Sequence, residues 1–208
     1  MYNQHPGGLR LTKQLIDYCG FKTGNKVLDV GCGTGTTVEY LGSCYGIQAT
    51  GIDIAESRLQ QGKEKSPQLQ LMYGAGHSLP FAESYFDGVV AECSLSLMLD
   101  QAKVVREISR VLKPGGKLAI SDIYLPESQY TVGYYNKGYL IELLQEQGLQ
   151  VLLWEDCSRF LKEFVACYIM EYGSITGLCS CMADRQSKMG YFLLIVEKRQ
   201  EGMNCIGE

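Results

Sequence analysis

Apolar and polar positions alternate along the chain with two periods, one typical of helices and one of buried strands. A helical spacing of leucines begins at Leu9 and ends with Cys19, just before Gly20, a residue that favours a helix C-terminus. Short apolar runs predict strands over 26–30, 49–54, 69–73 and 86–92. Helical spacing predicts helices over 36–44, 56–64 and 101–112. Strands that alternate with helices form parallel sheets covered on both faces, so the pattern predicts an α/β fold.

The second half of the chain continues this alternation. The motif Lys113-Pro114-Gly115-Gly116 predicts a turn before a strand over 117–122. A helix over 137–147 and strands over 149–154 and 191–198 follow. The stretch 156–190 is too long for an ordinary loop and has apolar residues at helical spacing, so we expect a helical insertion there. The whole chain, 1–208, is expected to form one domain, with an N-terminal lid and helix over 1–20.

Composition and charge exclude several classes of protein. Hydrophobic residues make up 46% and charged residues 20% of the 208, which excludes a disordered or low-complexity chain. A net charge of -4 argues against a nucleic-acid partner. The N-terminus lacks the pattern of a signal peptide, and no apolar run is long enough to span a membrane. We therefore expect a cytoplasmic protein with no membrane partner, either a monomer or a homodimer.

The chain has 9 cysteines, an odd number at irregular spacing. In a reducing cytosol this pattern predicts free thiols rather than disulfides. Free cysteines are commonly buried, so we expect packing to shield Cys19, Cys44 and Cys167, and the loop around it to shield Cys32.

Three glycines, Gly31, Gly33 and Gly35, follow the first predicted strand, where open α/β sheets bind ligands. Asp29 lies in the strand just before them, and Asp53 ends the next strand, where a carboxylate can accept hydrogen bonds from both hydroxyls of a ribose. No Lys-Ser/Thr pair follows, which excludes a Walker loop. The spacing of the third glycine also differs from the usual dinucleotide fingerprint, which counts against the dinucleotide alternative.

Five short motifs occur between residues 24 and 125. They are Val27-Leu28-Asp29-Val30-Gly31-Cys32-Gly33-Thr34-Gly35, Gly51-Ile52-Asp53-Ile54, Leu79-Pro80-Phe81, Phe86-Asp87-Gly88-Val89-Val90 and Arg110-Val111-Leu112-Lys113-Pro114-Gly115-Gly116. In this order and spacing they resemble the class I S-adenosylmethionine-dependent methyltransferases. The resemblance implies a doubly wound, Rossmann-like, mostly parallel seven-stranded sheet in the order 3-2-1-4-5-7-6, with the last strand antiparallel. It also implies S-adenosyl-L-methionine as the cofactor and methyl transfer to a small-molecule acceptor that the sequence does not identify.

The resemblance assigns cofactor roles to individual residues. The three loop glycines would lie under the methionine part, Asp29 would position its amino group directly or through water, and Asp53 would hold the ribose. Ala75 stands where the family commonly has an aspartate for the adenine amine, so backbone groups of Gly76 and His77 are expected to meet the adenine edge instead. The remaining residues assigned to the cofactor are Cys32, Ile54 and Glu92. No metal site is expected.

Methyl transfer from a sulfonium is an in-line displacement, so a base is needed only where the acceptor enters protonated. Glu92 and Cys93 end the fourth predicted strand, where the family faces the transferable methyl group. His5 belongs to the expected lid. We take these three as candidate catalytic residues. The structural alternatives are a capping acid for Glu92, a buried apolar residue for Cys93 and a flexible terminus for His5.

Two other functions stay open. Thiolates select soft ions, so Cys179 and Cys181, with Cys157 and Cys167, could hold a thiol-bound metalloid such as arsenite as the methyl acceptor. No CxxC pair supports that alternative. The chain could also bind the cofactor without catalysis. For an organic acceptor, the pair Tyr134-Tyr135 and the aromatic residues of the insertion are candidate pocket residues.

Overall fold

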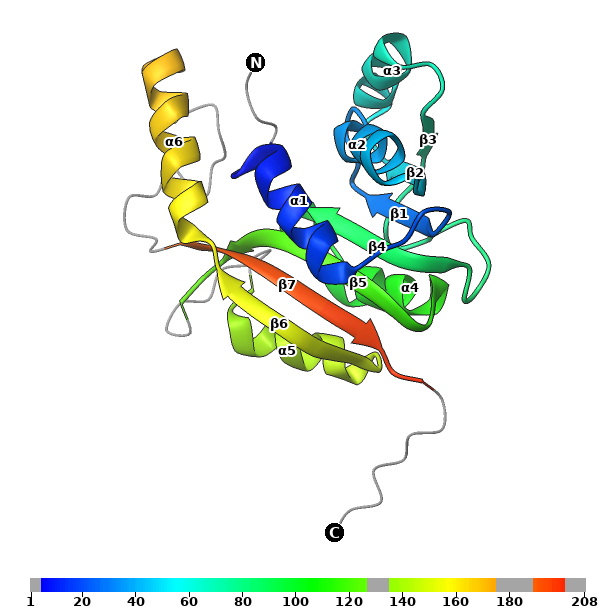
Figure 1. The fold of residues 1–208 in the computed structure, drawn as a ribbon. Helices are drawn as coiled ribbons and strands as arrows, with labels where there is room; N and C mark the ends of the chain where they lie inside the picture. Colours follow the sequence, from blue (N-terminus) through cyan, green and yellow to red (C-terminus); the bar gives the residue numbers. More distant parts are fainter. Residues whose placement is uncertain (1–4, 127–134, 175–188, 201–208) are drawn as a thin grey trace.

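A seven-stranded sheet runs through the centre of the molecule, with helices on both faces (Figure 1). The computed structural model describes residues 5–126, 135–174 and 189–200. The strands are β1 (Lys26–Val30), β2 (Gln48–Asp53), β3 (Gln70–Tyr73), β4 (Phe86–Glu92), β5 (Leu112–Tyr124), β6 (Leu149–Asp156) and β7 (Gly190–Lys198). The helices are α1 (Gly8–Cys19), α2 (Thr36–Tyr45), α3 (Glu56–Lys65), α4 (Gln101–Val111), α5 (Lys137–Glu146) and α6 (Ser158–Tyr172), with one 3-10 turn, η1 (Leu95–Leu97).

The strand order is β3-β2-β1-β4-β5-β7-β6, which confirms the order that the family resemblance implied. Strands β1 to β5 pair in parallel, whereas β7 is antiparallel to both β5 and β6. Strands covered on both faces must be apolar throughout, and every residue of β7 from Gly190 to Val196 is buried. Because β1 to β5 run in the same direction, their carboxyl ends lie along the same side of the sheet.

Each face of the sheet has its own apolar core. Helices α4 and α5 cover one face, where Ile108 and Leu144 pack on Leu28 and its neighbours. Helices α1, α2 and α6 cover the other face, with Leu15 and Phe160 in a second cluster. A smaller third cluster lies beneath α2 and α3.

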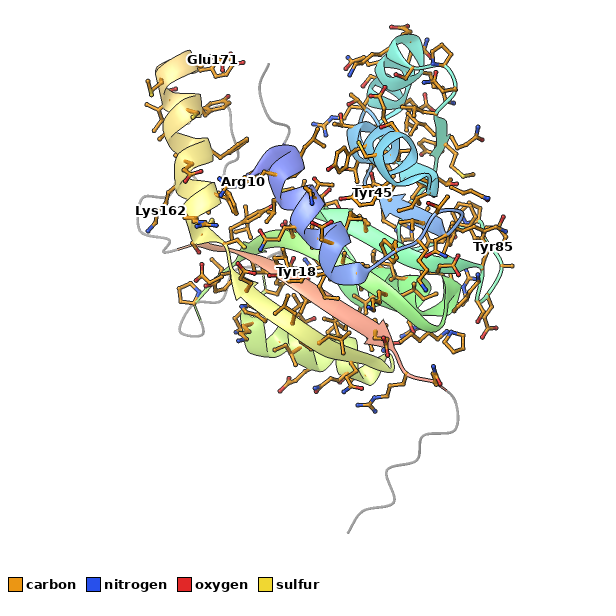
Figure 2. All side chains as sticks on the ribbon, in the orientation of Figure 1. Arg10, Tyr18, Tyr45, Tyr85, Lys162 and Glu171 are labelled. Atoms are coloured by element: carbon orange, nitrogen blue, oxygen red, sulfur yellow. The ribbon has the colours of Figure 1, made fainter. Side chains whose placement is uncertain are left out.

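Helix α1 lies across the second face and contacts elements far away in the sequence (Figure 2). Its Tyr18 hydroxyl donates to a carboxylate oxygen of Glu155 in β6, over 3.2 Å. Its Arg10 guanidinium stacks at 5.3 Å over the Phe160 ring of α6. The helix is therefore fixed at both ends, and its first turn sits beside the carboxyl ends of the strands.

Two expectations about secondary structure need correction or completion. The turn predicted at residues 113–116 is a bulge inside β5: Phe86 pairs with Leu112 and Gly88 with Lys117, so the intervening residues of β5 have no ladder partner. Gly115 takes the left-handed backbone, with φ +76°, that this bulge requires. Helix α6 fills the first part of the insertion expected over 156–190, and residues 175–188 lie outside the described part of the chain.

Candidate cofactor and active site

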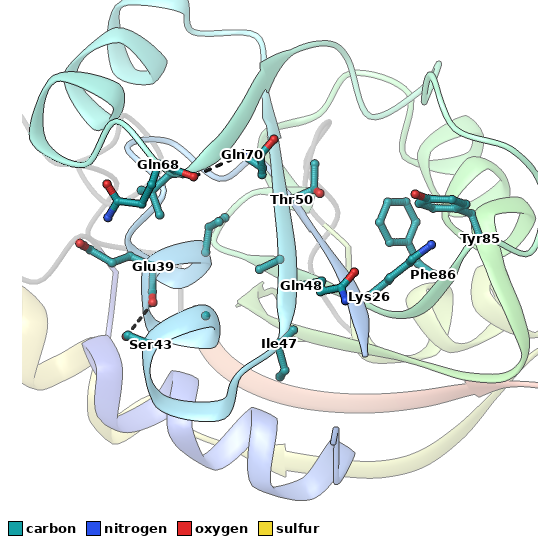
Figure 3. A pocket seen from close by; sticks show the side chains of 14 residues that line it. Lys26, Glu39, Ser43, Ile47, Gln48, Thr50, Gln68, Gln70, Tyr85 and Phe86 are labelled. Atoms are coloured by element: carbon teal, nitrogen blue, oxygen red, sulfur yellow. Dashed lines mark hydrogen bonds between the residues drawn. The ribbon is translucent and has the colours of Figure 1, made fainter. Parts of the chain in front are cut away.

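The sheet has a cavity at each end of its parallel strands. The larger, about 630 Å³, lies at their amino ends, between α2 and the starts of β2 and β3, and polar side chains such as Gln48, Thr50 and Gln70 line it (Figure 3). The smaller, about 380 Å³, lies at the carboxyl ends of β1, β2 and β4, beside the glycine loop. Open α/β sheets bind ligands at the carboxyl ends of their strands, so the smaller cavity is the candidate site.

Five of the residues predicted for the cofactor line this cavity, namely Gly31, Asp53, Ile54, Gly76 and His77. The sequence placed these residues in three separate segments, and the carboxyl ends of β1, β2 and β3 bring the segments together. Cys93, predicted as catalytic, is part of the same lining.

The glycine loop approaches the cavity without side chains. Gly31 has φ +83°, and a Cβ there would lie 2.4 Å from the Cβ of Ser94, so no other residue fits. Gly33 also has a left-handed backbone, with φ +54°, and a Cβ there would meet nothing closer than Arg58, at 3.9 Å. The loop is thus packed against Ser94 on one side and open on the other.

Asp53 is held in place by the backbone around it. One carboxylate oxygen accepts the N–H of Gly33 and the other accepts the N–H of Ala55, each over 2.8 Å. Each carboxylate oxygen has a further lone pair available for a second donor. The side chain is therefore oriented in advance, with acceptor capacity left for the two hydroxyls of a ribose.

Asp29 lies beneath the loop and is 4% exposed. Burial raises its pKa well above the usual range, and the charges of Glu92 and Asp53 raise it further. None of the ion pairs among the described residues involves Asp29 or Asp53. Two acidic groups thus lie at the glycine loop without an ion-pair partner among the described residues, although Arg58 and Lys103 belong to the lining of the same cavity. A ligand that carries an ammonium or sulfonium group favours the ionised form of Asp29.

Glu92 ties the end of β4 to two helices. Its carboxylate accepts the Thr12 hydroxyl of α1 over 3.0 Å and the Thr37 hydroxyl of α2 over 2.9 Å. Nε2 of His5 lies 3.7 Å from Oε1 of Glu92. The structure therefore brings together two of the three predicted catalytic residues, and the expected lid reaches Glu92 through His5.

Sequence reasoning missed Thr12 and Thr37. Thr12 lies on the buried, otherwise apolar face of α1 next to Leu11 and Leu15. A polar side chain in such a position needs a hydrogen-bond partner, and that was the available signal. The identity of the partner was not available, because Glu92 is 80 residues away in the sequence.

Cys93 has an unusual backbone and a neutral thiol. Its φ is +49°, and its N–H donates to the carbonyl of Ser121 over 2.7 Å. Its Sγ lies 3.1 Å from the Tyr191 hydroxyl. Burial, followed by the charge of Asp122, raises its pKa well above the usual value for a thiol. The side chain therefore offers a thiol rather than a thiolate to the cavity.

Two of the four cysteines expected to be shielded are exposed. Cys19 and Cys32 are buried as predicted, but Cys44 and Cys167 are exposed, because they lie on the outer sides of α2 and α6. The Cys32 side chain packs toward Gly51, where a Cβ would lie 2.6 Å from its Sγ. Only the backbone of Cys32 is thus left for a cofactor contact.

The residues named for the other acceptors are partly outside the described ranges. Cys179, Cys181 and Tyr134 all lie there. Tyr135 is 1% exposed and belongs to the core under α5 rather than to the cavity lining. Within the described ranges, no group of three His, Cys, Asp or Glu residues is arranged to hold a metal ion.

The cavity has a second wall that the sequence did not predict, formed by the segment between β4 and α4. Leu97 and Leu99 line it and are 70% and 107% exposed, although both are large and apolar. Asp100 lines it as well, so the cavity contains a second carboxylate besides Asp53, although Ala75 stands where an aspartate for the adenine amine was expected. The segment 95–99, which is apolar at every position except Ser96, was the available signal, because surface turns are seldom so apolar.

Comparison with known proteins confirms the family that the sequence motifs resemble. Residues 28–120 match the family model of a methyltransferase domain. The chain is 35% identical to the O-methyltransferase cnsE of Penicillium expansum over 216 residues, which cover 92% of this chain and 78% of that protein. It is 32% identical to the O-methyltransferase resE of Aspergillus sclerotiorum over 166 residues, which cover 71% of this chain and 63% of that protein.

A solved structure with the same fold is that of the [4+2]-cyclase SpnF, with a TM-score of 0.77 and 26% identity, over 91% of this chain and 81% of that one. The fold, the site and these relatives define a class I methyltransferase domain. The chain belongs to the class I S-adenosylmethionine-dependent methyltransferases, and S-adenosyl-L-methionine is its cofactor. It spans 63% of the length of resE and 54% of that of the O-methyltransferase rstn1 of Aspergillus nomiae NRRL.

Proposed function

We propose that this protein transfers the methyl group of S-adenosylmethionine to a hydroxyl group of a small organic molecule. The observation that carries the proposal is the cluster of three acidic side chains at the glycine loop, Asp29, Asp53 and Glu92, none of which forms an ion pair with a Lys or Arg of the described ranges. The relatives named as O-methyltransferases favour a hydroxyl acceptor. When bound, the cofactor supplies an activated methyl group on a sulfonium.

The residues around the cavity divide the binding of the cofactor among them. Asp53, oriented by Gly33 and Ala55, accepts the ribose hydroxyls. Ile54 and the backbone of Gly76 and His77 form the wall for the adenine. The loop itself, Gly31 to Gly35, lets the backbone lie against the methionine part, and the backbone of Cys32 belongs to this contact. Asp29 holds the amino group, because a cation beside its carboxyl group favours the ionised form that accepts hydrogen bonds.

His5 and Glu92 are proposed to remove the acceptor proton. A hydroxyl enters the site protonated and must lose its proton as the new bond to carbon forms. His5 lies within 3.7 Å of the Glu92 carboxylate, so the imidazole can accept the proton while Glu92 stabilises the resulting charge. Thr12 and Thr37 fix Glu92 in place for this role. Cys93 lines the cavity as a neutral thiol and positions the acceptor by contact.

We further propose that residues 1–208 form one domain, because β1 to β7 belong to a single sheet. No helix within the described residues is long and apolar enough to cross a membrane. We also propose that the protein is cytoplasmic and that it acts on a free small molecule, without a nucleic-acid or membrane partner. We find no observation on the described residues that favours an arsenite acceptor or a binding protein without catalysis.

The proposal is tested by incubating the protein with methyl-labelled S-adenosylmethionine and a metabolite extract, followed by mass spectrometry of labelled products. We expect one or a few small molecules to gain a labelled O-methyl group. The variant Asp53→Ala should lose this transfer, whereas Asp87→Asn, at the opposite end of the strands, should retain it. Tight cofactor binding without transfer to any compound would reject methyl transfer and favour another reaction on the same fold, as in the relative named as a cyclase.

A further inference from the structure

A fully buried carboxylate at the end of β5 has no part in the chemistry described so far. Asp122 is 0% exposed, and none of the ion pairs among the described residues includes it. Its oxygens accept the N–H of Ser96 over 2.9 Å, the hydroxyl of Ser96 over 2.6 Å and the N–H of Ile123 over 2.8 Å. Two of its three hydrogen bonds thus go to a single residue, Ser96.

Ser96 belongs to the turn 93–98, which forms part of the cavity wall. Cys93 and Met98, at the two ends of this turn, both line the cavity. On the other side the turn is packed against the glycine loop, where the Ser94 hydroxyl donates to the carbonyl of Val30 over 2.7 Å. The turn therefore lies between the glycine loop and Asp122.

The backbone of this turn is in a conformation that must be held from outside. Cys93 has φ +49°, a region that residues other than glycine rarely occupy unless their surroundings enforce it. Its N–H is bound by the carbonyl of Ser121, the residue before Asp122. Both anchors of the turn on this side therefore come from the end of β5.

Tyr135 closes the other side of Asp122. Its ring is buried, and its hydroxyl has no partner at ordinary hydrogen-bond distance among the described residues, but it lies near enough to Asp122 to lower the pKa of that carboxyl group, which burial raises. The buried carboxylate therefore depends on its bonds to Ser96 and to the N–H of Ile123.

We propose that Asp122 is a positioning residue of the methyltransferase site, which holds the turn 93–98 in the form that makes the cofactor cavity. The proposal rests on the proposed function only in taking this cavity as the cofactor site. Asp122 touches neither cofactor nor acceptor in this role. It acts through Ser96 on Cys93 and Met98.

The test compares cofactor affinity with stability in a set of variants. Asp122→Asn places an amide N–H₂ group against at least one N–H donor, so it loses one bond and sets two donors against each other. Ser96→Ala removes only the hydroxyl bond. Ser109→Ala is the matched control, because its buried hydroxyl makes one comparable bond, to the carbonyl of Gln147 over 2.8 Å, away from the cavity.

The dissociation constant of S-adenosylhomocysteine is measured by calorimetry well below the melting temperature of every variant. We expect roughly tenfold weaker binding for Asp122→Asn and a smaller loss for Ser96→Ala, whereas Ser109→Ala should melt earlier with unchanged affinity. If Asp122→Asn does not fold, Ser96→Ala alone decides the question. Lower melting temperatures with unchanged affinity in both variants would show that Asp122 is merely structural.

A second readout follows the turn directly. Iodoacetamide labelling of Cys93, measured on its own peptide by mass spectrometry, should be several-fold faster in Asp122→Asn, because the substitution removes a charge that raises the pKa of the thiol and loosens its turn. An unchanged labelling rate would count against the proposal. If the wild-type protein does not bind S-adenosylhomocysteine at all, the cavity assignment itself fails, and this outcome is distinct from a failure of Asp122 alone.

Discussion

At Asp53, two backbone N–H groups already occupy one acceptor position on each carboxylate oxygen. This arrangement fixes the direction of the side chain before any ligand arrives, so little conformational entropy is lost on binding. The same bonds also tie the glycine loop to the start of α3. A substitution here therefore affects both the ligand and the loop that carries it.

We expect Asp53→Ala to weaken S-adenosylmethionine binding by roughly 10- to 100-fold, because two hydrogen bonds to the ribose are lost and the Gly33 N–H loses its acceptor. Calorimetry measures this directly. Asp87→Ala serves as a control, since Asp87 pairs with Lys113 at the amino end of the sheet. Wild-type affinity in Asp53→Ala would show that the ribose lies elsewhere.

Asp29 makes cofactor binding depend on pH. Its pKa is raised in the folded protein, so the folded state holds a proton that the unfolded state releases, and stability falls as the pH rises from the unfolded to the folded pKa. A cationic ligand favours the ionised carboxylate, so cofactor binding should release a proton, and affinity should fall as the pH is lowered through the folded pKa. The heat of binding should then vary with the ionisation enthalpy of the buffer, and Asp29→Asn should abolish that variation.

Among the elements, α1 is tied to the site through the bond from Thr12 to Glu92. We expect Thr12→Val, which keeps the shape and removes the donor, to lower the free energy of unfolding by about 1–3 kcal/mol in urea denaturation. It should also slow methyl transfer, because Glu92 loses one of the groups that orient it.

Thr23→Val is the matched comparison, since the Thr23 hydroxyl makes a single exposed bond, to the carbonyl of Tyr45. Thr23→Val should lower the free energy of unfolding by well under half as much as Thr12→Val. Equal losses in the two variants would mean that the Glu92 contact contributes nothing beyond an ordinary surface bond.

The order and type of the elements followed from the sequence, because each strand and helix is a local apolar pattern. The bulge at residues 113–116 did not, since Pro114 and two glycines signal a break without saying whether the strand resumes in register. Cys44 and Cys167 were wrongly predicted to be buried, because helical spacing shows which face of a helix is apolar but not which face packs against the rest of the protein. Within the site, the glycine loop and Asp53 could be predicted from the sequence, because each belongs to a short local motif.

The pairs that hold the site together were beyond sequence reasoning for a different reason. Thr12 and Glu92 are 80 residues apart, and Ser96 and Asp122 are 26 apart. Their partners are decided by the packing of α1 and of β5 beside β4, which is a property of the assembled sheet. A polar residue on an apolar face indicates that it has a hydrogen-bond partner, but only the folded structure shows which residue the partner is.

For the molecule as a whole, the cofactor is expected to act as a stabiliser by mass action. A ligand present at 100 times its dissociation constant adds about 2.7 kcal/mol to the free energy of unfolding. For a chain of this length that corresponds to a rise of about 5–10 °C in melting temperature. Thermal melts with S-adenosylmethionine and with NAD test this, and only the former should shift the transition. A shift with NAD alone would reject the cofactor assignment.

The position of β7 has a consequence for how the chain is made. It is the last of the seven strands in the sequence, yet it lies between β5 and β6 rather than at an edge. During synthesis β5 and β6 are made before β7, so each lacks this partner until the last strand follows. Both are open, apolar edges of the kind that capture other chains. We therefore expect the nascent protein to stay prone to capture by other chains until residues 190–198 are available to pair with both strands.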